Sequence, residues 1–151
     1  MRSVSSWLSE YDESHHDPTN KLLHFICVPA IVLAVFGLLW SIPLHSASPW
    51  LNVATLVAAA VLLYYLALSP SLAAGMLLAF ALLAVATHAL ASLAWPLWAT
   101  STAIFVVAWI GQFAGHAVEG KRPSFFRDLQ FLLIGPLWLL AALYRRLGLR
   151  C

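Results

Sequence analysis

Charged residues are scarce in this chain of 151 residues, because only 9% are Asp, Glu, Lys or Arg and 62% are hydrophobic. Soluble domains contain about 25% charged residues. The stretch from Leu22 to Val118 contains no charged residue at all, and the mean hydropathy of the whole chain is +0.87. These values exclude a soluble globular protein. They indicate an integral membrane protein, which we predict to form a single domain over residues 1–151.

Several other features are also missing from the sequence. The two cysteines, Cys27 and Cys151, are too few for a disulfide framework, and a net charge of +2 is too small to predict nucleic-acid binding. Residues 1–14 carry charges but no apolar core, so they do not form a secretory signal, and we expect the mature protein to begin at Met1. The sequence contains no nucleophile elbow, phosphate-binding loop or zinc-protease motif.

Helices are predicted along most of the chain. A membrane-crossing helix needs roughly 20 apolar residues, and four runs of about this length occur, over residues 22–40, 50–68, 72–90 and 97–115. Asp17-Pro18, just before the first run, is typical of a helix start. Nearer the N-terminus, residues 3–14 carry apolar side chains at helical spacing, which predicts an amphipathic helix at the membrane interface: Val4, Trp7, Leu8 and Tyr11.

The last apolar segment, residues 129–144, is short and is interrupted by Gly135-Pro136. A full crossing would place the three arginines that follow it on the outside: Arg145, Arg146 and Arg150. We therefore favour a re-entrant or interfacial helical hairpin over a fifth span, since irregular backbone at membrane depth is tolerated when protein covers it. The predicted fold is an all-α, multi-pass helical bundle with four spans, an N-terminal interfacial helix and this C-terminal re-entrant or fifth helix.

Four crossings return a chain to the side from which it started. His24 and His116, at the two ends of the charge-free block, should therefore lie on the same side of the membrane, and His45 and His88 should lie toward the other. Positive residues cluster beside the first pair: Lys21, Lys121, Arg122 and Arg127. The positive-inside rule makes that side cytoplasmic, in a bacterial inner membrane or in the endoplasmic reticulum of a eukaryote.

Histidines and a carboxylate flank the charge-free block, as His15, His16 and His24 before it and as His116 and Glu119 at its end. On a straight helix His16 and His24 would lie about 12 Å apart at a rise of 1.5 Å per residue, too far to share a metal ion. If the helix begins at Pro18, His15 and His16 belong to a loop that can fold back. Neutral imidazoles with a carboxylate suit a first-row divalent metal, and open positions suit Fe(II) that activates oxygen.

Two residues are candidates to orient these ligands through hydrogen bonds, namely Asp17 and Gln112. Other interpretations remain open at this point. A small transporter or channel could use histidines to pass protons or metal ions, but the charge-free block offers only His88 at depth. A bis-histidine haem protein and a membrane scaffold are further alternatives. We expect His88 to be a hydrogen-bonded structural residue and His45 to be solvated.

Two motifs resemble the membrane 2-hydroxy fatty acid dioxygenase family, which acts in the metabolism of phytosphingosine to odd-numbered fatty acids. The first is His15-His16-Asp17-Pro18-Thr19-Asn20-Lys21-Leu22-Leu23-His24, followed by Val28-Pro29. The second is Trp109-Ile110-Gly111-Gln112-Phe113-Ala114-Gly115-His116, followed by Glu119-Gly120-Lys121-Arg122-Pro123. The likeness extends over residues 11–140.

The resemblance implies an Fe(II)-dependent α-oxidation in which a 2-hydroxy fatty acid reacts with O2, releases CO2 and leaves a fatty acid one carbon shorter. It implies iron ligands at His16, His24 and His116, with His15 as a further candidate. Glu119 matches an acidic position of the family, and we take it as a candidate catalytic residue together with His16, His24 and His116. The substrate carboxylate could be held through charge-assisted bonds by Lys21, Lys121 or Arg122, beside Asn20 and Gln112. The expected partners are the 2-hydroxy fatty acid, O2 and membrane lipids, and the oligomeric state is left open.

Overall fold

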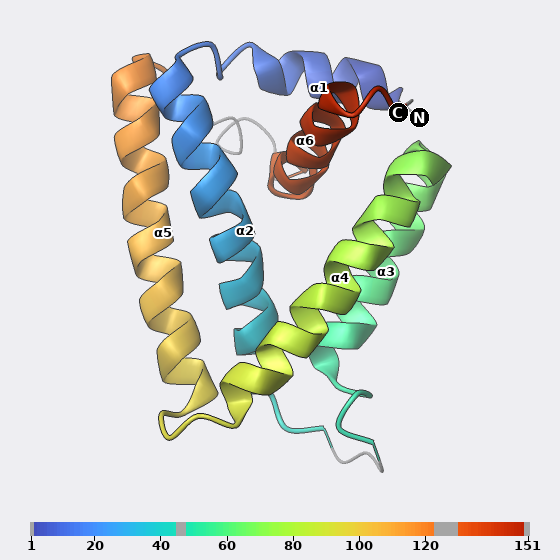
Figure 1. The fold of residues 1–151 in the computed structure, drawn as a ribbon, viewed down its shortest axis with the longest axis vertical. Helices are drawn as coiled ribbons and strands as arrows, with labels where there is room; N and C mark the ends of the chain where they lie inside the picture. The colour runs from blue at the N-terminus through green and yellow to red at the C-terminus, as the bar shows by residue number, and fades with distance from the viewer. Residues whose placement is uncertain (1, 45–47, 123–129, 150–151) are drawn as a thin grey trace.

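The computed structural model describes residues 2–44, 48–122 and 130–149, and within these ranges it contains six α-helices and no strand. The helices are α1 (Val4–Asp12), α2 (Pro18–Trp40), α3 (Val53–Leu68), α4 (Pro70–Ala91), α5 (Leu97–Glu119) and α6 (Phe131–Arg146) (Figure 1). The predicted all-α class is confirmed. Of these helices, α2, α4 and α5 are long and apolar enough to cross a membrane, and α3 is apolar but has 16 residues.

The start of α2 follows the predicted local chemistry. The Asp17 carboxylate caps the helix by accepting hydrogen bonds from the backbone N–H groups of Thr19 (2.7 Å) and Asn20 (3.1 Å), and Pro18 occupies the first helical position. Such a cap contributes about 1 kcal/mol to helix stability. Because α2 begins at Pro18 and α1 ends at Asp12, His15 and His16 lie in the short connection between the two helices.

Helices α2 to α5 form two pairs, with α2 packed along α5 and α3 packed along α4; the pairs diverge from the lower end in Figure 1. Two glycines of α5 permit the close approach to α2. A Cβ atom at Gly111 would lie 2.6 Å from the Cys27 sulfur, and one at Gly115 would lie 2.6 Å from Asn20 Oδ1. Small residues of this kind let membrane helices approach closely.

His24 and His116 lie at the same end of the bundle, as expected. The rings of His24 and His116 have centroids only 4.9 Å apart. His88 lies at the other end of the bundle, where its side chain is exposed. The centroid of its ring is 4.9 Å from that of Trp50 and 6.3 Å from that of Trp40. His45 lies outside the described residues.

Helices α1 and α6 lie together at the histidine end of the bundle (Figure 1). The amphipathic character predicted for α1 is confirmed, and its apolar face is buried against α6, with the Trp7 and Phe131 rings 5.3 Å apart. The indole N–H of Trp138 donates to Asp12 Oδ1 (3.2 Å), and the Tyr65 hydroxyl donates to the Leu133 carbonyl (2.6 Å). These bonds join α6 to both α1 and α3.

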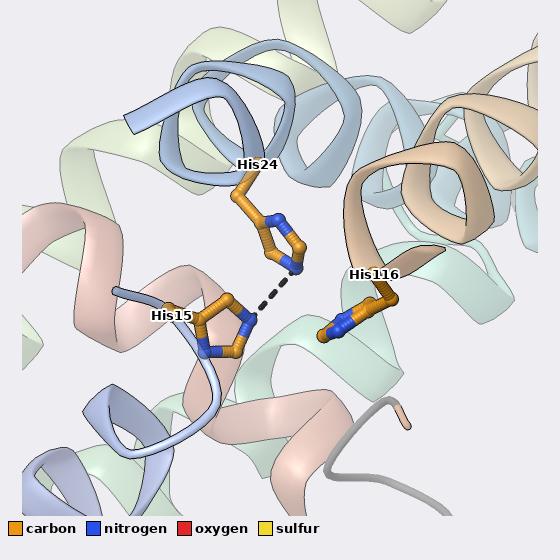
Figure 2. Close-up of side chains that lie close together, drawn as sticks. All are labelled: His15, His24 and His116. Carbon is orange, nitrogen blue, oxygen red and sulfur yellow. Dashed lines mark hydrogen bonds between the residues drawn. The ribbon is translucent and has the colours of Figure 1, made fainter. Parts of the chain in front are cut away.

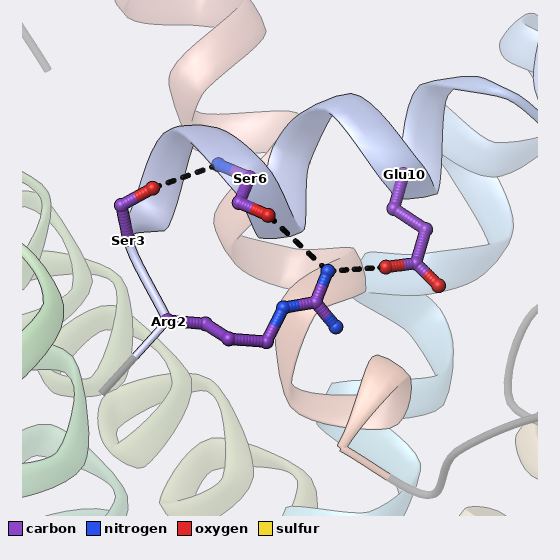
Figure 3. Close-up of polar contacts among 4 residues, drawn as sticks. All are labelled: Arg2, Ser3, Ser6 and Glu10. Atoms are coloured by element: carbon purple, nitrogen blue, oxygen red, sulfur yellow. Dashed lines mark hydrogen bonds and ion pairs between the residues drawn. The ribbon is translucent and has the colours of Figure 1, made fainter.

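The outer face of α1 is polar (Figure 3). Ser3 caps the helix by accepting from the Ser6 N–H (3.2 Å), and the Arg2 guanidinium donates to the Ser6 hydroxyl and to the Glu10 carboxylate. The same guanidinium lies 4.1 Å from the centre of the Trp7 ring. Exposed ion pairs contribute little stability, so the buried apolar face fixes the position of α1.

The interruption predicted at Gly135-Pro136 is wrong, because α6 continues through both residues as one helix. A proline in a helix interior costs about 3 kcal/mol. Here it is offset by burial, since Ile134 and Leu137 on either side are completely buried in the core. The outward faces of α3, α4 and α5 remain apolar and exposed, which suits contact with lipid, as at Leu63, Leu78 and Val107.

Candidate metal centre

Three histidines from three different segments meet at one point: His15 in the connection before α2, His24 in α2 and His116 in α5 (Figure 2). All three are at least 95% buried. One nitrogen of each ring lies within 4.8 Å of the others, close enough for the group to hold a metal ion. Within the described ranges no other histidine, cysteine or carboxylate joins them.

The hydrogen bonds of His15 and His24 fix where each ring carries its proton. His15 Nδ1 lies 2.6 Å from the Tyr11 carbonyl oxygen, and His24 Nδ1 lies 2.9 Å from the Asn20 carbonyl oxygen. A carbonyl only accepts, so each Nδ1 donates a proton, and each neutral ring presents a lone pair at Nε2. The bonds also fix the ring orientations, as partners of metal-bound histidines do.

The two lone pairs face one another, because the Nε2 atoms of His15 and His24 are 2.9 Å apart (Figure 2). Two lone pairs at this distance repel unless a cation lies between them. Burial lowers the pKa of His15, outweighing the opposite effects of the Tyr11 carbonyl and the Glu119 carboxylate, and so disfavours an added proton. A divalent metal ion therefore fits this pair better than a proton does.

His116 completes the fit. Its Nδ1 atom is buried and has no hydrogen-bond partner within the described part of the chain. A buried imidazole nitrogen without a partner is costly, and a metal ion near the three rings would satisfy it. The donor set is three neutral imidazoles, which suits a first-row divalent metal such as iron or zinc.

Aromatic rings hold His15 in place. The Tyr11 ring stacks on it with centroids 4.3 Å apart and planes 8° apart, and Trp138 lies 5.3 Å away. Sequence reasoning did not assign either residue to the site. The spacing of four between Tyr11 and His15 is a local signal that could have found the first residue, whereas Trp138 is over 120 positions distant and has no local signal.

Glu119 ties the connection before α2 to the end of α5. Its carboxylate accepts from the backbone N–H groups of His16 (2.9 Å) and Asp17 (2.8 Å) and from Asn20 Nδ2 (3.0 Å). Asn20 Nδ2 also donates to the Ser14 carbonyl (3.2 Å). These bonds occupy the Glu119 carboxylate, which is not a member of the histidine group, and they fix the backbone on both sides of His15.

The structure separates other predicted residues from the histidine group. His16 is exposed, and Asp17 caps α2. Lys21 lines a different cavity with Asp12, Trp138 and Arg145, whereas the Lys121 ammonium group donates to the Glu13 carbonyl and Arg122 is exposed. The described part of the chain therefore brings none of the three predicted cations into the lining of the histidine site.

A small cavity of about 60 Å³ adjoins two of the histidines, and its lining includes Tyr11, His24, Gln112 and His116. The Gln112 side chain is 5% exposed, and its Nε2 atom has no hydrogen-bond partner among the described residues. A buried amide donor is thus available beside the histidines. Of the polar side chains expected to contact substrate, Gln112 is the one that lines this cavity.

Comparisons with known proteins place nearly the whole chain beside one family. The family model described as "2-hydroxy-palmitic acid dioxygenase Mpo1-like" matches residues 1–147. The 2-hydroxy-palmitic acid dioxygenase MPO1 of Saccharomyces cerevisiae is 29% identical over 152 residues, a match that covers 98% of this chain and 83% of the yeast protein. No solved structure matches the chain.

Replacing one histidine of the group should remove the metal. We expect His15→Ala, His24→Ala and His116→Ala each to hold less than about one-tenth of the wild-type metal, because loss of a ligand leaves two donors at most. His16→Ala is the matched control, and it should keep wild-type metal content because His16 is exposed. Metal analysis after reloading, with circular dichroism to verify folding, gives the answer. Equal metal loss in His16→Ala would contradict the assignment.

Removing the Glu119 carboxylate should release the segment that carries His15. In Glu119→Ala we expect metal affinity to fall about 10–100-fold, the usual effect of losing a residue that orients a ligand. Amide hydrogen exchange at His16 and Asp17 should accelerate, because their N–H groups lose their acceptor. Glu13→Ala removes a neighbouring exposed carboxylate and should change neither quantity. Unchanged exchange in Glu119→Ala would refute this role.

Proposed function

This chain belongs to the Mpo1-like family, and from that membership we propose that it is an Fe(II)-dependent membrane dioxygenase that shortens 2-hydroxy fatty acids by one carbon. The observation that carries the proposal is the pair of facing Nε2 atoms of His15 and His24, 2.9 Å apart, beside a cavity that contains an unpaired amide donor. A relative at 29% identity bears the name of a 2-hydroxy-palmitic acid dioxygenase.

The proposed reaction balances without a further reductant. One 2-hydroxy fatty acid and one O2 give one fatty acid shortened by a carbon, one CO2 and one water. The bond between carbons 1 and 2 breaks, carbon 2 becomes the new carboxyl carbon, and carbon 1 leaves as CO2. These two carbons lose four electrons in total, and the same four electrons reduce O2. Fe(II) bound by histidines with open positions supplies the activation of O2.

The protein residues have separate tasks in this proposal. His15, His24 and His116 would hold the ion, and the carbonyls of Tyr11 and Asn20 keep the first two rings oriented. Gln112 would donate its amide N–H to the substrate carboxylate, a bond that is stronger for a charged acceptor. The buried walls exclude water, which strengthens that bond further.

We propose that α2, α3, α4 and α5 all cross the bilayer and that α1 and α6 lie at the membrane interface. The whole chain would form a single domain. The histidine end also carries Lys21, Arg145 and Arg146, which border one cavity there. By the positive-inside rule this end faces the cytoplasm, and Arg127 and Arg150 lie outside the described residues. The substrate carboxylate would reach the site at this interface.

A path for ions is not favoured, because no carboxylate or further histidine lies between His24 and the far end of α2.

The function can be tested with purified protein. After anaerobic reloading with Fe(II), the protein should convert 2-hydroxypalmitic acid and O2 to pentadecanoic acid with about one equivalent of CO2. The same protein loaded with Zn(II), which has no redox chemistry, should form no product. Protein that binds iron but never shortens a 2-hydroxy acid, whatever its chain length, would refute the proposal.

The proposed contact of Gln112 gives a second prediction. Gln112→Leu keeps the size of the side chain but removes the amide, so we expect KM to rise about tenfold, which corresponds to about 1.4 kcal/mol. Gln112→Glu should raise KM further, because two carboxylates would repel. Metal content should stay unchanged in both variants. Thr102→Val changes an exposed position of the same helix and is the control, so its KM should equal that of the wild type. A wild-type KM in both Gln112 variants would exclude the contact.

A further inference from the structure

A large apolar groove of about 410 Å³ lies between the two helix pairs, and α6 lines the end of it that is nearest the histidines. The described residues of its walls come from α2, α3, α4, α5 and α6, and their polar side-chain groups are the Tyr65 hydroxyl and the Trp109 indole N–H. That hydroxyl already donates to the Leu133 carbonyl. The volume falls in the range of roughly 300–1,000 Å³ that is usual for ligand pockets, and the lining suits a hydrocarbon.

The groove adjoins the small cavity beside the histidines. Five residues line both spaces: Ile31, Val32, Trp109, Leu132 and Pro136. Taken together, the two adjoining spaces have one polar end, at His24, His116 and Gln112, and one apolar end, at Leu39 and Ala54. A molecule with a carboxylate at one end and a long alkyl chain at the other has this same polarity.

The combined length of the cavity and the groove also suits a long-chain carboxylic acid. Leu39 follows His24 by 15 helical positions, so about 22 Å separates them along α2 at a rise of 1.5 Å per residue. With C–C bonds of about 1.5 Å, an extended alkyl chain advances roughly 1.25 Å per bond, so a 16-carbon acid spans about 19 Å and a 10-carbon acid about 11 Å. A long-chain acid therefore fits with its carboxyl group at the histidines.

We infer that this groove binds the alkyl chain of the 2-hydroxy acid, with the methyl end toward Leu39 and Ala54, and that its depth sets the accepted chain length. The inference rests on the proposed function. Val35 and Val57, on the groove wall, are each about two-fifths exposed. The groove thus has an edge open between α2 and α3, and the chain enters sideways from the bilayer.

Small side chains keep the lower part of the groove open. Ala54 lies near its floor and is completely buried, and Ala58 lines the wall one helical turn above. A larger residue at position 58 would shorten the groove by about 6 Å, the rise of four helical residues. Long chains would then be excluded while short chains still fit, and the histidines and Gln112 would be left untouched.

The test compares chain lengths in the iron-loaded Ala58→Phe variant. We expect kcat/KM for 2-hydroxypalmitic acid to fall at least tenfold, while kcat/KM for 2-hydroxydecanoic acid stays within twofold of wild type. Ala60→Phe places the same ring on the exposed outer face of α3 and should leave both values unchanged. Equal loss for both substrates, or no loss for either, would overturn the inference.

A second measurement does not depend on turnover or on folding of a variant. Metal-free wild-type protein in phospholipid nanodiscs is irradiated with a 2-hydroxy fatty acid of 16 carbons that carries a diazirine at its methyl end. Adducts should fall within residues 35–39 and 54–58 and disappear when unlabelled 2-hydroxypalmitic acid is added. Adducts spread over outward residues such as Ala60 and Val107 would overturn the inference that the groove binds the alkyl chain.

The two inferences fail in different ways. If wild-type protein shortens no 2-hydroxy acid but the label still enters the groove, the proposed reaction is wrong and the binding site stands. If wild-type protein is active and Ala58→Phe keeps the wild-type preference for chain length, the groove assignment is wrong and the reaction stands.

Discussion

The close approach of α2 and α5 is the constraint on which the site depends. Helix association inside a bilayer gains little from the hydrophobic effect, so close packing has to supply the attraction. Gly111 and Gly115 let the backbones meet where any Cβ would clash with Cys27 or Asn20. Two imidazoles that are 92 positions apart in the sequence thereby come within contact distance. If the helices separated, the third histidine would have no pair to join.

Hydrogen bonds then fix the positions of the segments that carry the histidines. The connection before α2 is short and irregular, and its backbone N–H groups need acceptors. Glu119 accepts two of them and the Asn20 amide. The Glu119 carboxylate, a candidate for catalysis, thus orients the loop. This division leaves the metal group with imidazoles alone, each neutral ring offering a lone pair where the others converge.

Much of this arrangement could be predicted from the sequence. The helix start at Asp17-Pro18 and the shared end of His24 and His116 follow from local capping chemistry and from counting chain reversals. The choice between His15 and His16 could not be predicted, because neighbouring residues in a loop follow no helical period. The contact of Trp138 with His15 and the continuity of α6 through Pro136 likewise depend on tertiary burial, which local propensity does not contain.

The groove has an exposed edge at Val35 and Val57. Substrate entry at this edge would make the rate depend on the concentration of substrate within the membrane. An enzyme that takes its substrate sideways from a bilayer responds to the mole fraction of that substrate among the lipids. Added phospholipid would then dilute the substrate at constant bulk concentration and slow the reaction. The shortened product would return to the same lipid phase and compete with fresh substrate for the same groove, so the surrounding membrane would act as both reservoir and sink.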